Sequence, residues 1–262
     1  MALTQDIIAK LAQHLENAEL EIHDVTKITD DHPDMDWKDA YDIQYEIRRR
    51  KLARGNRLSG LKMGLTSHAK MKQMNVEDPI YGFLMDYFSL PDGARVKTSE
   101  LIHPKIEAEI GFVTKAPLHG PGCHIGAVLA ATDFVLPTVE ILDSRYRDFK
   151  FDLKSVVADN ASSARYVSGG RSRQVEELDL KNLGVVIEKN GRIVATAAGS
   201  AVLGHPAASV AMLANMLAER GEHIPAGTFI MTGGMTEAIS VEAGDHIVAR
   251  YQDLGQVSMT FI

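Results

Sequence analysis

The stretch IHPKIEAEIGFV, residues 102–113, has the alternating pattern of a β-strand and carries two glutamates two positions apart. Side chains of a strand point to opposite faces in turn, so Glu107 and Glu109 share one face, and the residues next to them are apolar. Two neighbouring carboxylates repel each other unless water screens them or a cation binds them. The pattern therefore leaves two interpretations: the solvated face of a half-buried strand, or a portion of a cation site.

The composition predicts an ordinary globular protein. The 262 residues suffice for one large domain or for a catalytic domain with a smaller companion, and 45% of them are hydrophobic. A formal net charge of −7 disfavours a nucleic-acid partner, which needs a basic face. No apolar run approaches the ~18 residues of a membrane span, and the start lacks a secretory signal pattern. The single cysteine, Cys123, excludes an internal disulfide and fits a reducing cytoplasm.

Helical patterns dominate the N-terminal region of the chain. Residues 4–20 have apolar positions at helical spacing, and a second helix is predicted for residues 37–55, behind Asp36 as its N-cap. One later helix is indicated by the apolar stripe of residues 210–217, which ends before a glycine.

The remainder is predicted to form short strands separated by glycine. They are residues 58–65, 106–113, 133–142, the two runs of 183–196, and the segments GTFIM, HIVARY and QVSMTFI. An Asn-Gly pair at 190–191 is typical of a β-hairpin. The expected fold class is α+β, in which residues 1–85 form a smaller helical region and lid that includes the strand around Lys62. Residues 86–262 are expected to form a β-rich, metal-binding catalytic domain.

A third glutamate lies in an apolar segment of another predicted strand. Glu140, in FVLPTVEILDSR (134–145), has apolar neighbours, and an unpaired buried carboxylate is energetically costly. One interpretation is a salt bridge from Glu140 to Arg145 or Arg147. The other is an all-oxygen site formed together with the glutamate pair of residues 102–113, which suits Mg²⁺. Zinc is disfavoured because none of the ten histidines forms an HxH or HExxH pattern.

A lysine occurs in a similarly unusual setting. In GLKMGL, residues 60–65, Lys62 lies between two apolar residues, and the flanking glycines let another backbone or a ligand come close. A buried lysine at such a position suits proton transfer or the binding of a carboxylate. The alternative is an edge-strand lysine that prevents aggregation.

Two further stretches combine small, polar and glycine residues. VADNASSARYVSGG (157–170) contains Ser162, and MTGGMT (231–236) contains Thr232 and Gly233. Glycine pairs expose backbone N–H groups that can bind an anion. Ordinary tight turns are the alternative for both stretches.

Seven segments, in this order along nearly the whole chain, resemble the fumarylacetoacetate hydrolase superfamily. They are GLKMGLTS, IHPKIEAEI, PTVEILDSRYRDFKFD, VADNAS, EKNG, LGHPAASVAMLAN and AGTFIMTGG. Within that superfamily they are similar to the branch of hydratases and decarboxylases that act in the meta-cleavage pathways of aromatic catabolism. The resemblance implies a mixed β-roll or sandwich body with a metal-centred cleft.

The resemblance also assigns roles to residues. It implies that Glu107, Glu109 and Glu140 hold Mg²⁺, with Mn²⁺ as a substitute, and that Lys62 is a catalytic residue beside the substrate. Substrate contacts are expected from Leu65, Ile80, Ser162, Thr232 and Gly233.

One segment helps to choose between the activities of this branch. Its hydratases carry an aspartate in a PDFG-like segment, whereas this chain has PIYG at residues 79–82, with Ile80 at that position. Asp78, two residues earlier, falls on the opposite parity of an extended segment and is a poor substitute. The resemblance therefore implies a carboxy-lyase that converts 2-oxo-3-hexenedioate to 2-hydroxypenta-2,4-dienoate, or its keto form 2-oxopent-4-enoate, and CO₂.

Two other functions stay open from the sequence. The first is the sister activity, hydration of 2-hydroxypenta-2,4-dienoate. The second is a non-catalytic protein that binds structural Ca²⁺ through the three glutamates, although calcium usually takes six to eight oxygen ligands. The resemblance further implies a physical complex with a hydratase that consumes the unstable dienol product.

Overall fold

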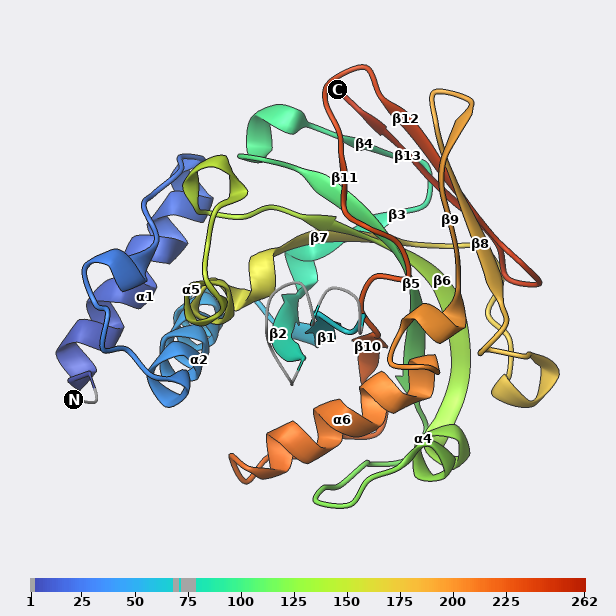
Figure 1. The fold of residues 1–262 in the computed structure, drawn as a ribbon, viewed down its shortest axis with the longest axis horizontal. Coiled ribbons are helices and arrows are strands. Elements are labelled where there is room, and N and C mark those ends of the chain that lie inside the picture. The colour runs from blue at the N-terminus through green and yellow to red at the C-terminus, as the bar shows by residue number, and fades with distance from the viewer. Residues whose placement is uncertain (1–2, 68–70, 72–78) are drawn as a thin grey trace.

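The computed structural model describes residues 3–67, 71 and 79–262 and confirms the predicted α+β class. Asp78 lies outside the described residues. The α-helices are α1 (Gln5–Glu21), α2 (Trp37–Ala53), α4 (Ile125–Ala131), α5 (Leu153–Ala158) and α6 (Pro206–Ala218). Short 3₁₀ turns are Ile28–Asp30, Asp86–Phe88, Thr98–Glu100, Arg147–Phe149, Asn160–Ser162, Val175–Glu177 and Gly199–Ala201. Figure 1 shows α1, α2 and α5 gathered on one side of the strands, while α4 and α6 lie together elsewhere.

The two N-terminal helices begin where the sequence predicts. The Thr4 side chain accepts a hydrogen bond from the Ile7 N–H at the start of α1. At α2, Asp36 accepts from the Asp39 N–H at 2.8 Å, and the Asp39 carboxylate accepts from the Asp36 N–H at 3.2 Å. This reciprocal pair satisfies two of the N–H groups that a helix start leaves unpaired, so the predicted N-cap at Asp36 is confirmed.

The larger sheet carries the predicted site strands. Within the described residues its order is β2-β1-β10-β5-β6-β7-β3, and β11 also pairs with β5. The bounds are β1 Leu58–Gly64, β2 Ile80–Met85, β3 Ser89–Pro91, β5 Lys105–Thr114, β6 Thr132–Leu142, β7 Ser163–Ser168, β10 Phe229–Met231 and β11 Ile239–Ser240. β1 runs parallel to β10, whereas β5 pairs antiparallel with both β10 and β6.

The smaller sheet packs its apolar face against the larger one. Its order among the described strands is β4-β13-β12-β8-β9. The bounds are β4 Ala94–Val96, β8 Gly184–Lys189, β9 Arg192–Ala198, β12 His246–Tyr251 and β13 Gly255–Phe261. β8 and β9 form the predicted hairpin, in which Asn190 and Gly191 have φ of 54° and 75°. Both values are positive, as the tight hairpin turn requires.

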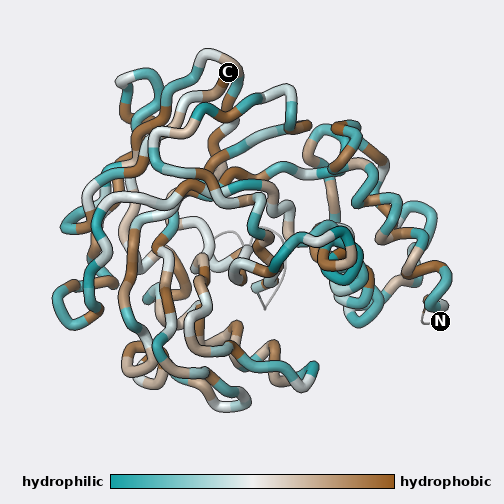
Figure 2. The backbone as a smooth tube through the Cα atoms, turned by 180° about the vertical axis from the view of Figure 1, so that it is seen from behind, coloured by the Kyte–Doolittle hydropathy of each residue, from teal (hydrophilic) through white to brown (hydrophobic). Residues whose placement is uncertain are grey.

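The hydrophobic core has two main regions. The larger region lies between the two sheets and α6, and the other lies among α1, α2 and α5. Figure 2 shows apolar residues concentrated along the central strands, whereas polar and apolar positions alternate along the N-terminal helices. This alternation follows from helices that bury one face only.

The α6 region corrects one expectation from the sequence. By length and composition alone, Gly199–Ala218 could cross a membrane, although no such run was expected. Half of this stretch is buried inside the protein. The predicted apolar stripe, represented by Val210 and Leu213, is fully buried in the main core, so the helix is apolar because it packs there.

The expected division of the chain at residue 85 runs through the larger sheet. β1 falls within residues 1–85, but it pairs with β10, which falls within residues 86–262. The helices α1 and α2 form the separate core described above. The division into two domains stays a prediction.

Candidate active site

The strand pairing brings the three glutamates together in the protein interior. Glu107 on β5 lies directly opposite Glu140 on β6, and Glu109 lies opposite Thr138. Glu107, Glu109 and Glu140 are 8%, 0% and 1% exposed. The solvated-face interpretation of residues 102–113 is therefore wrong, because this face of β5 is buried.

Lys62 reaches the same place from β1. Its Nζ lies 3.0 Å from Glu140 Oε2 and donates to the Ala161 carbonyl at 3.1 Å. β1 has β2 on one side and β10 on the other, so the edge-strand interpretation of Lys62 is wrong. Gly82 makes room for the lysine, because a Cβ there would lie 3.3 Å from Lys62 Cδ and 2.8 Å from the Asn160 carbonyl.

The interpretation of Glu140 as the partner of Arg145 or Arg147 is also wrong. Glu140 pairs with Lys62, Arg145 pairs with the buried Asp159, and Arg147 pairs with Asp24. β6 ends at Leu142, so both arginines lie beyond the strand, and each binds a different carboxylate there.

The burial of three neighbouring glutamate carboxylates is electrostatically unfavourable. Burial, followed by the charge of Glu140, raises the pKa of Glu109 well above its usual value of 4.5. Burial also raises the pKa of Glu140, although the Lys62 ammonium opposes this shift. Among the described residues, Glu109 Oε1 and Glu140 Oε1 are buried without a hydrogen-bond partner. Such oxygens are costly in a folded protein, and a bound cation would satisfy them.

Protein donors hold some of the oxygens of this carboxylate cluster. The Gly233 N–H donates to Glu109 Oε2 at 2.7 Å, and Lys62 faces Glu140 Oε2 as described. In the described residues of the chain, no group of three or more His, Cys, Asp or Glu side chains already has the arrangement of a metal site. The donor set of three carboxylates and the two unpartnered oxygens fit a hard, oxygen-binding cation such as Mg²⁺.

The segment 160–162 has an unusual backbone beside Lys62. Asn160, Ala161 and Ser162 have φ of 51°, 53° and 55°, the left-handed region that non-glycine residues rarely adopt. Each such residue costs about 1–2 kcal/mol, so surrounding contacts must hold the segment. Ser162 is buried, and its Oγ has no hydrogen-bond partner among the described residues. The predicted substrate contact Ser162 therefore lies next to Ala161, which contacts Lys62.

The remaining predicted substrate contacts differ in how they are placed. Gly233, with φ of 93°, binds Glu109 through its N–H, whereas the Thr232 hydroxyl donates to the Ile110 carbonyl inside the sheet. Leu65 follows β1 in a left-handed conformation, with φ of 55°. Ile80 is buried at the first residue of β2.

The apolar side chain of Ile80 lies close to the lysine. A Cβ built on Gly64 would lie 3.2 Å from Ile80 Cγ1 and 3.6 Å from Lys62 Nζ. Both atoms therefore approach the same small space above Gly64. Ile80 stands at the position where the resemblance implies an aspartate in the hydratases. An apolar side chain therefore lies beside the lysine at this position.

Sequence reasoning missed one polar residue at this site. Thr66 is buried, and its Oγ1 has no hydrogen-bond partner among the residues described. A Cβ on Gly233 would collide with Thr66 Oγ1, so the hydroxyl closes over the glycine that binds Glu109. Thr66 is the seventh residue of GLKMGLTS, and its place in that segment was the available signal.

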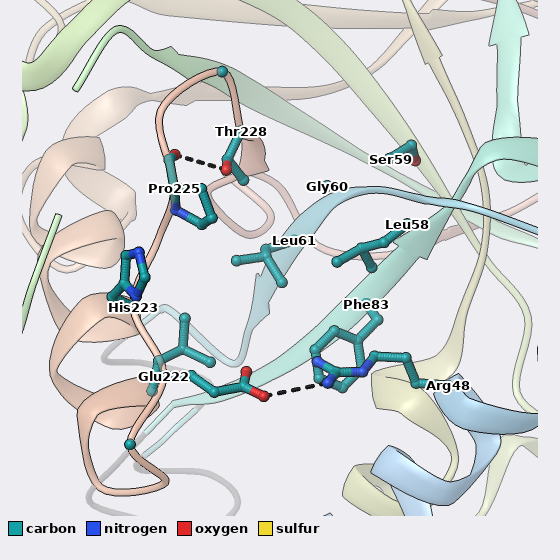
Figure 3. A pocket seen from close by; sticks show the side chains of 13 residues that line it. Arg48, Leu58, Ser59, Gly60, Leu61, Phe83, Glu222, His223, Pro225 and Thr228 are labelled. Atoms are coloured by element: carbon teal, nitrogen blue, oxygen red, sulfur yellow. Dashed lines mark hydrogen bonds and ion pairs between the residues drawn. The ribbon is translucent and has the colours of Figure 1, made fainter. Parts of the chain in front are cut away.

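A separate cavity of about 500 Å³ opens on the opposite face of β1 (Figure 3). Leu61, rather than Lys62, contributes to its lining, because neighbouring strand residues point to opposite faces. Several of its polar groups already bind within the protein: Arg48 pairs with Glu222 at 3.2 Å, and the Thr228 hydroxyl donates to the Pro225 carbonyl. The buried carboxylate cluster is therefore the better candidate for chemistry.

The fold and the site define the class of protein. Residues 63–262 match the family model described as fumarylacetoacetate (FAA) hydrolase C-terminal. The chain belongs to the fumarylacetoacetate hydrolase family, and the fold implied by the resemblance is confirmed.

Within this family the chain is similar to decarboxylases and, more distantly, to hydratases. It is 70% identical to 4-oxalocrotonate decarboxylase of Pseudomonas sp. (strain CF600), over 99% of this chain and 98% of that protein. The solved structure of 4-oxalocrotonate decarboxylase from Pseudomonas putida G7, complexed with magnesium and adipate, matches with a TM-score of 0.98 and 68% identity over 99% of both chains. The 2-oxo-hept-4-ene-1,7-dioate hydratase of Escherichia coli is 36% identical, over 96% of this chain and 97% of that protein.

Proposed function

We propose that the protein is a metal-dependent carboxy-lyase that decarboxylates 2-oxo-3-hexenedioate, also called 4-oxalocrotonate. The observation that carries this proposal is the buried cluster of three glutamates with Lys62, in a chain 70% identical to a decarboxylase of this substrate. Adipate, the ligand of the similar solved structure, is a six-carbon dicarboxylate like the proposed substrate. The proposed products are CO₂ and 2-hydroxypenta-2,4-dienoate or its keto form, which places the reaction in the meta-cleavage of aromatic compounds.

Glu107, Glu109 and Glu140 would hold Mg²⁺, or Mn²⁺ in its place. The unpartnered oxygens of Glu109 and Glu140 support this assignment. When bound, such an ion supplies Lewis-acid stabilisation for negative charge that develops on a 2-oxo acid. The Gly233 N–H keeps the Glu109 carboxylate in place, and the buried setting excludes water from it.

The chain's own groups account for the remaining steps. The C5–C6 bond of the substrate breaks, CO₂ leaves, and the electron pair moves through the C3=C4 bond to the C2 oxygen, which takes a proton. Lys62 either anchors a substrate carboxylate or supplies that proton, and both roles use its position against Glu140. Leu65, Ser162, Thr232 and Gly233 are the proposed substrate contacts.

The apolar Ile80 favours loss of CO₂ over addition of water. Desolvation of a carboxylate raises its free energy relative to a transition state in which the charge is delocalised. Ile80 lies near the Lys62 ammonium and offers no acid for proton transfer in hydration.

The direct test is to supply 2-oxo-3-hexenedioate and Mg²⁺ to the purified protein and to measure CO₂ release. The same protein is offered 2-hydroxypenta-2,4-dienoate, whose hydration would identify the sister activity instead. Absence of CO₂ release would overturn the proposal. Scanning calorimetry with Ca²⁺ addresses the non-catalytic alternative, because a structural ion raises the melting temperature strongly.

We further propose a cytoplasmic location and a complex with a hydratase that consumes the dienol before it ketonises. The single cysteine supports the location. The hydratase relative shares most of its length with this chain, so surfaces that join identical subunits could also join the two enzymes. Co-expression and size-exclusion chromatography test the complex. Separate elution at micromolar concentrations, with free dienol accumulating in the coupled reaction, would count against it.

A further inference from the structure

The left-handed segment 160–162 is held from both ends. It connects α5 to β7, and its middle residue, Ala161, offers its carbonyl to Lys62 at 3.1 Å. Three successive non-glycine residues keep this backbone only where neighbouring groups fix it. The contacts that fix it therefore also determine where the Lys62 ammonium lies.

Asn160 makes the contact at one end. Its Nδ2 donates to the Phe83 carbonyl at 2.9 Å, and its Oδ1 accepts from the Phe83 N–H at 2.8 Å. The amide thus pairs with β2 as a neighbouring strand would, at the end of the sheet where β2 lies. Gly82 permits this approach, because a Cβ there would lie 3.0 Å from Asn160 Oδ1.

Arg145 holds the two residues that flank the segment. Its guanidinium binds both the carboxylate and the carbonyl of Asp159, and it donates to the Ser163 carbonyl at 3.1 Å. The residues before and after the left-handed segment are therefore tied to one rigid side chain. The Asn160 side chain links the segment to β2, and β2 pairs with β1, the strand that carries Lys62.

We propose that Asn160 is a positioning residue for the reaction, since it fixes the Ala161 carbonyl and, through it, the ammonium of Lys62. This inference rests on the proposed function. Without the Asn160 amide, the carbonyl is no longer held over β1, and the ammonium is left to its ion pair with Glu140. The lysine then turns toward the carboxylate cluster and away from the substrate. Misplacement of a catalytic group by about 1 Å can lower the rate by about 10²-fold.

The test is Asn160→Gly, with Asn190→Gly as the matched control. Glycine accepts a left-handed backbone at either position. Asn190 also has positive φ and also makes two side-chain hydrogen bonds, to Asp245 and to the His246 N–H, but it lies in the hairpin of the smaller sheet. Both variants therefore lose the same kind of contact, one beside Lys62 and one in the other sheet.

Three quantities are measured for each variant: kcat for CO₂ release, the dissociation constant of adipate, and the melting temperature. We expect kcat of Asn160→Gly to fall by about 10- to 100-fold. Adipate binding stays within about twofold of wild type where Lys62 supplies the proton, and it weakens where Lys62 anchors a substrate carboxylate. For Asn190→Gly we expect an unchanged kcat and a lowered melting temperature. A merely structural role for Asn160 would lower the melting temperature and leave kcat as in the control, and that result would overturn the inference.

Asn160→Asp decides the question if the glycine variant does not fold. Aspartate has nearly the same shape and retains an acceptor for the Phe83 N–H, but it loses the donor to the Phe83 carbonyl. Lowered kcat supports the inference, whether adipate binding is retained or weakened, and wild-type kcat overturns it. Failure of the wild-type protein to release CO₂ would instead refute the proposed function, so the two failures are distinguishable.

Discussion

Two buried ion pairs in this protein differ in how completely their polar atoms are used. Arg145 and Asp159 bind each other, and the guanidinium also donates to the carbonyls of Asp143 and Ser163. Lys62 and Glu140 bind each other too, but Glu140 Oε1 has no hydrogen-bond partner among the described residues. The first pair is complete without a ligand, and the second is not. A folded protein retains such an incomplete cluster where another molecule or ion completes it.

Removal of divalent cations should affect the two ion pairs most differently. We expect EDTA to abolish CO₂ release and Mg²⁺ or Mn²⁺ to restore it, because the carboxylate cluster needs a cation to act on the substrate. The Arg145–Asp159 pair needs none, so the chelated protein should stay folded by circular dichroism. Undiminished turnover after thorough chelation would rule out the proposed mechanism.

Replacement of the two most buried lysines among the described residues should have the next largest effect. Lys62→Ala should lower kcat by about 10²–10⁴-fold, the usual contribution of a general acid–base group, while metal binding is retained. Lys51→Ala is the control, because Lys51 is equally buried but pairs with Glu19 and Tyr87 beside the N-terminal helices. That variant should lose stability and keep kcat. Equal kcat values in steady-state assays of the two variants would remove Lys62 from the mechanism.

Replacing one acid by its amide should change the stability in opposite directions in the Arg145–Asp159 pair and in the carboxylate cluster. Asp159→Asn removes the carboxylate that buried Arg145 binds directly, and breaking a buried ion pair costs about 3–5 kcal/mol of unfolding free energy. Glu109→Gln removes a carboxyl whose charged form burial and the neighbouring glutamates disfavour, and it retains an acceptor for the Gly233 N–H. The metal-free Glu109→Gln protein should therefore be as stable as wild type or more so, yet bind Mg²⁺ weakly. Urea unfolding and titration calorimetry measure both effects; a strongly destabilised Glu109→Gln would favour a structural ion.

The sequence predicted the composition of the site better than its assembly. The spacing of Glu107 and Glu109 shows that they share a strand face, since side-chain parity is a local property. The register that pairs Glu107 with Glu140 is not local, because it depends on how two distant strands align. For the same reason, the sequence left an arginine open as the partner of Glu140 when Lys62 is the partner.

The fold shows the same limit. The helix start at Asp36 and the hairpin at Asn190 were predictable because capping and turn chemistry reside in a few adjacent residues. The position of β1 between β2 and β10 was not predictable from pattern, and it reverses the edge-strand interpretation of Lys62. The left-handed backbone of Ala161 also has no local cause, since tertiary contacts impose it against the intrinsic preference of alanine.

The smallest expected effect is the pH dependence of the metal-free protein. The folded-state pKa of Glu109 is raised well above the usual value of 4.5. Between these two pKa values the folded state therefore binds more protons than the unfolded state does. The stability contributed by the protonated carboxyl is fully present below about pH 4.5 and is lost as the pH rises through the raised pKa. One such proton corresponds to at most about 1.4 kcal/mol per pH unit. Urea unfolding of the chelated protein at several pH values should show this slope, and Glu109→Gln should reduce it, because glutamine does not titrate. An unchanged slope in Glu109→Gln would assign the titration to another buried acid whose pKa is raised, such as Glu140 in the same cluster or Asp159.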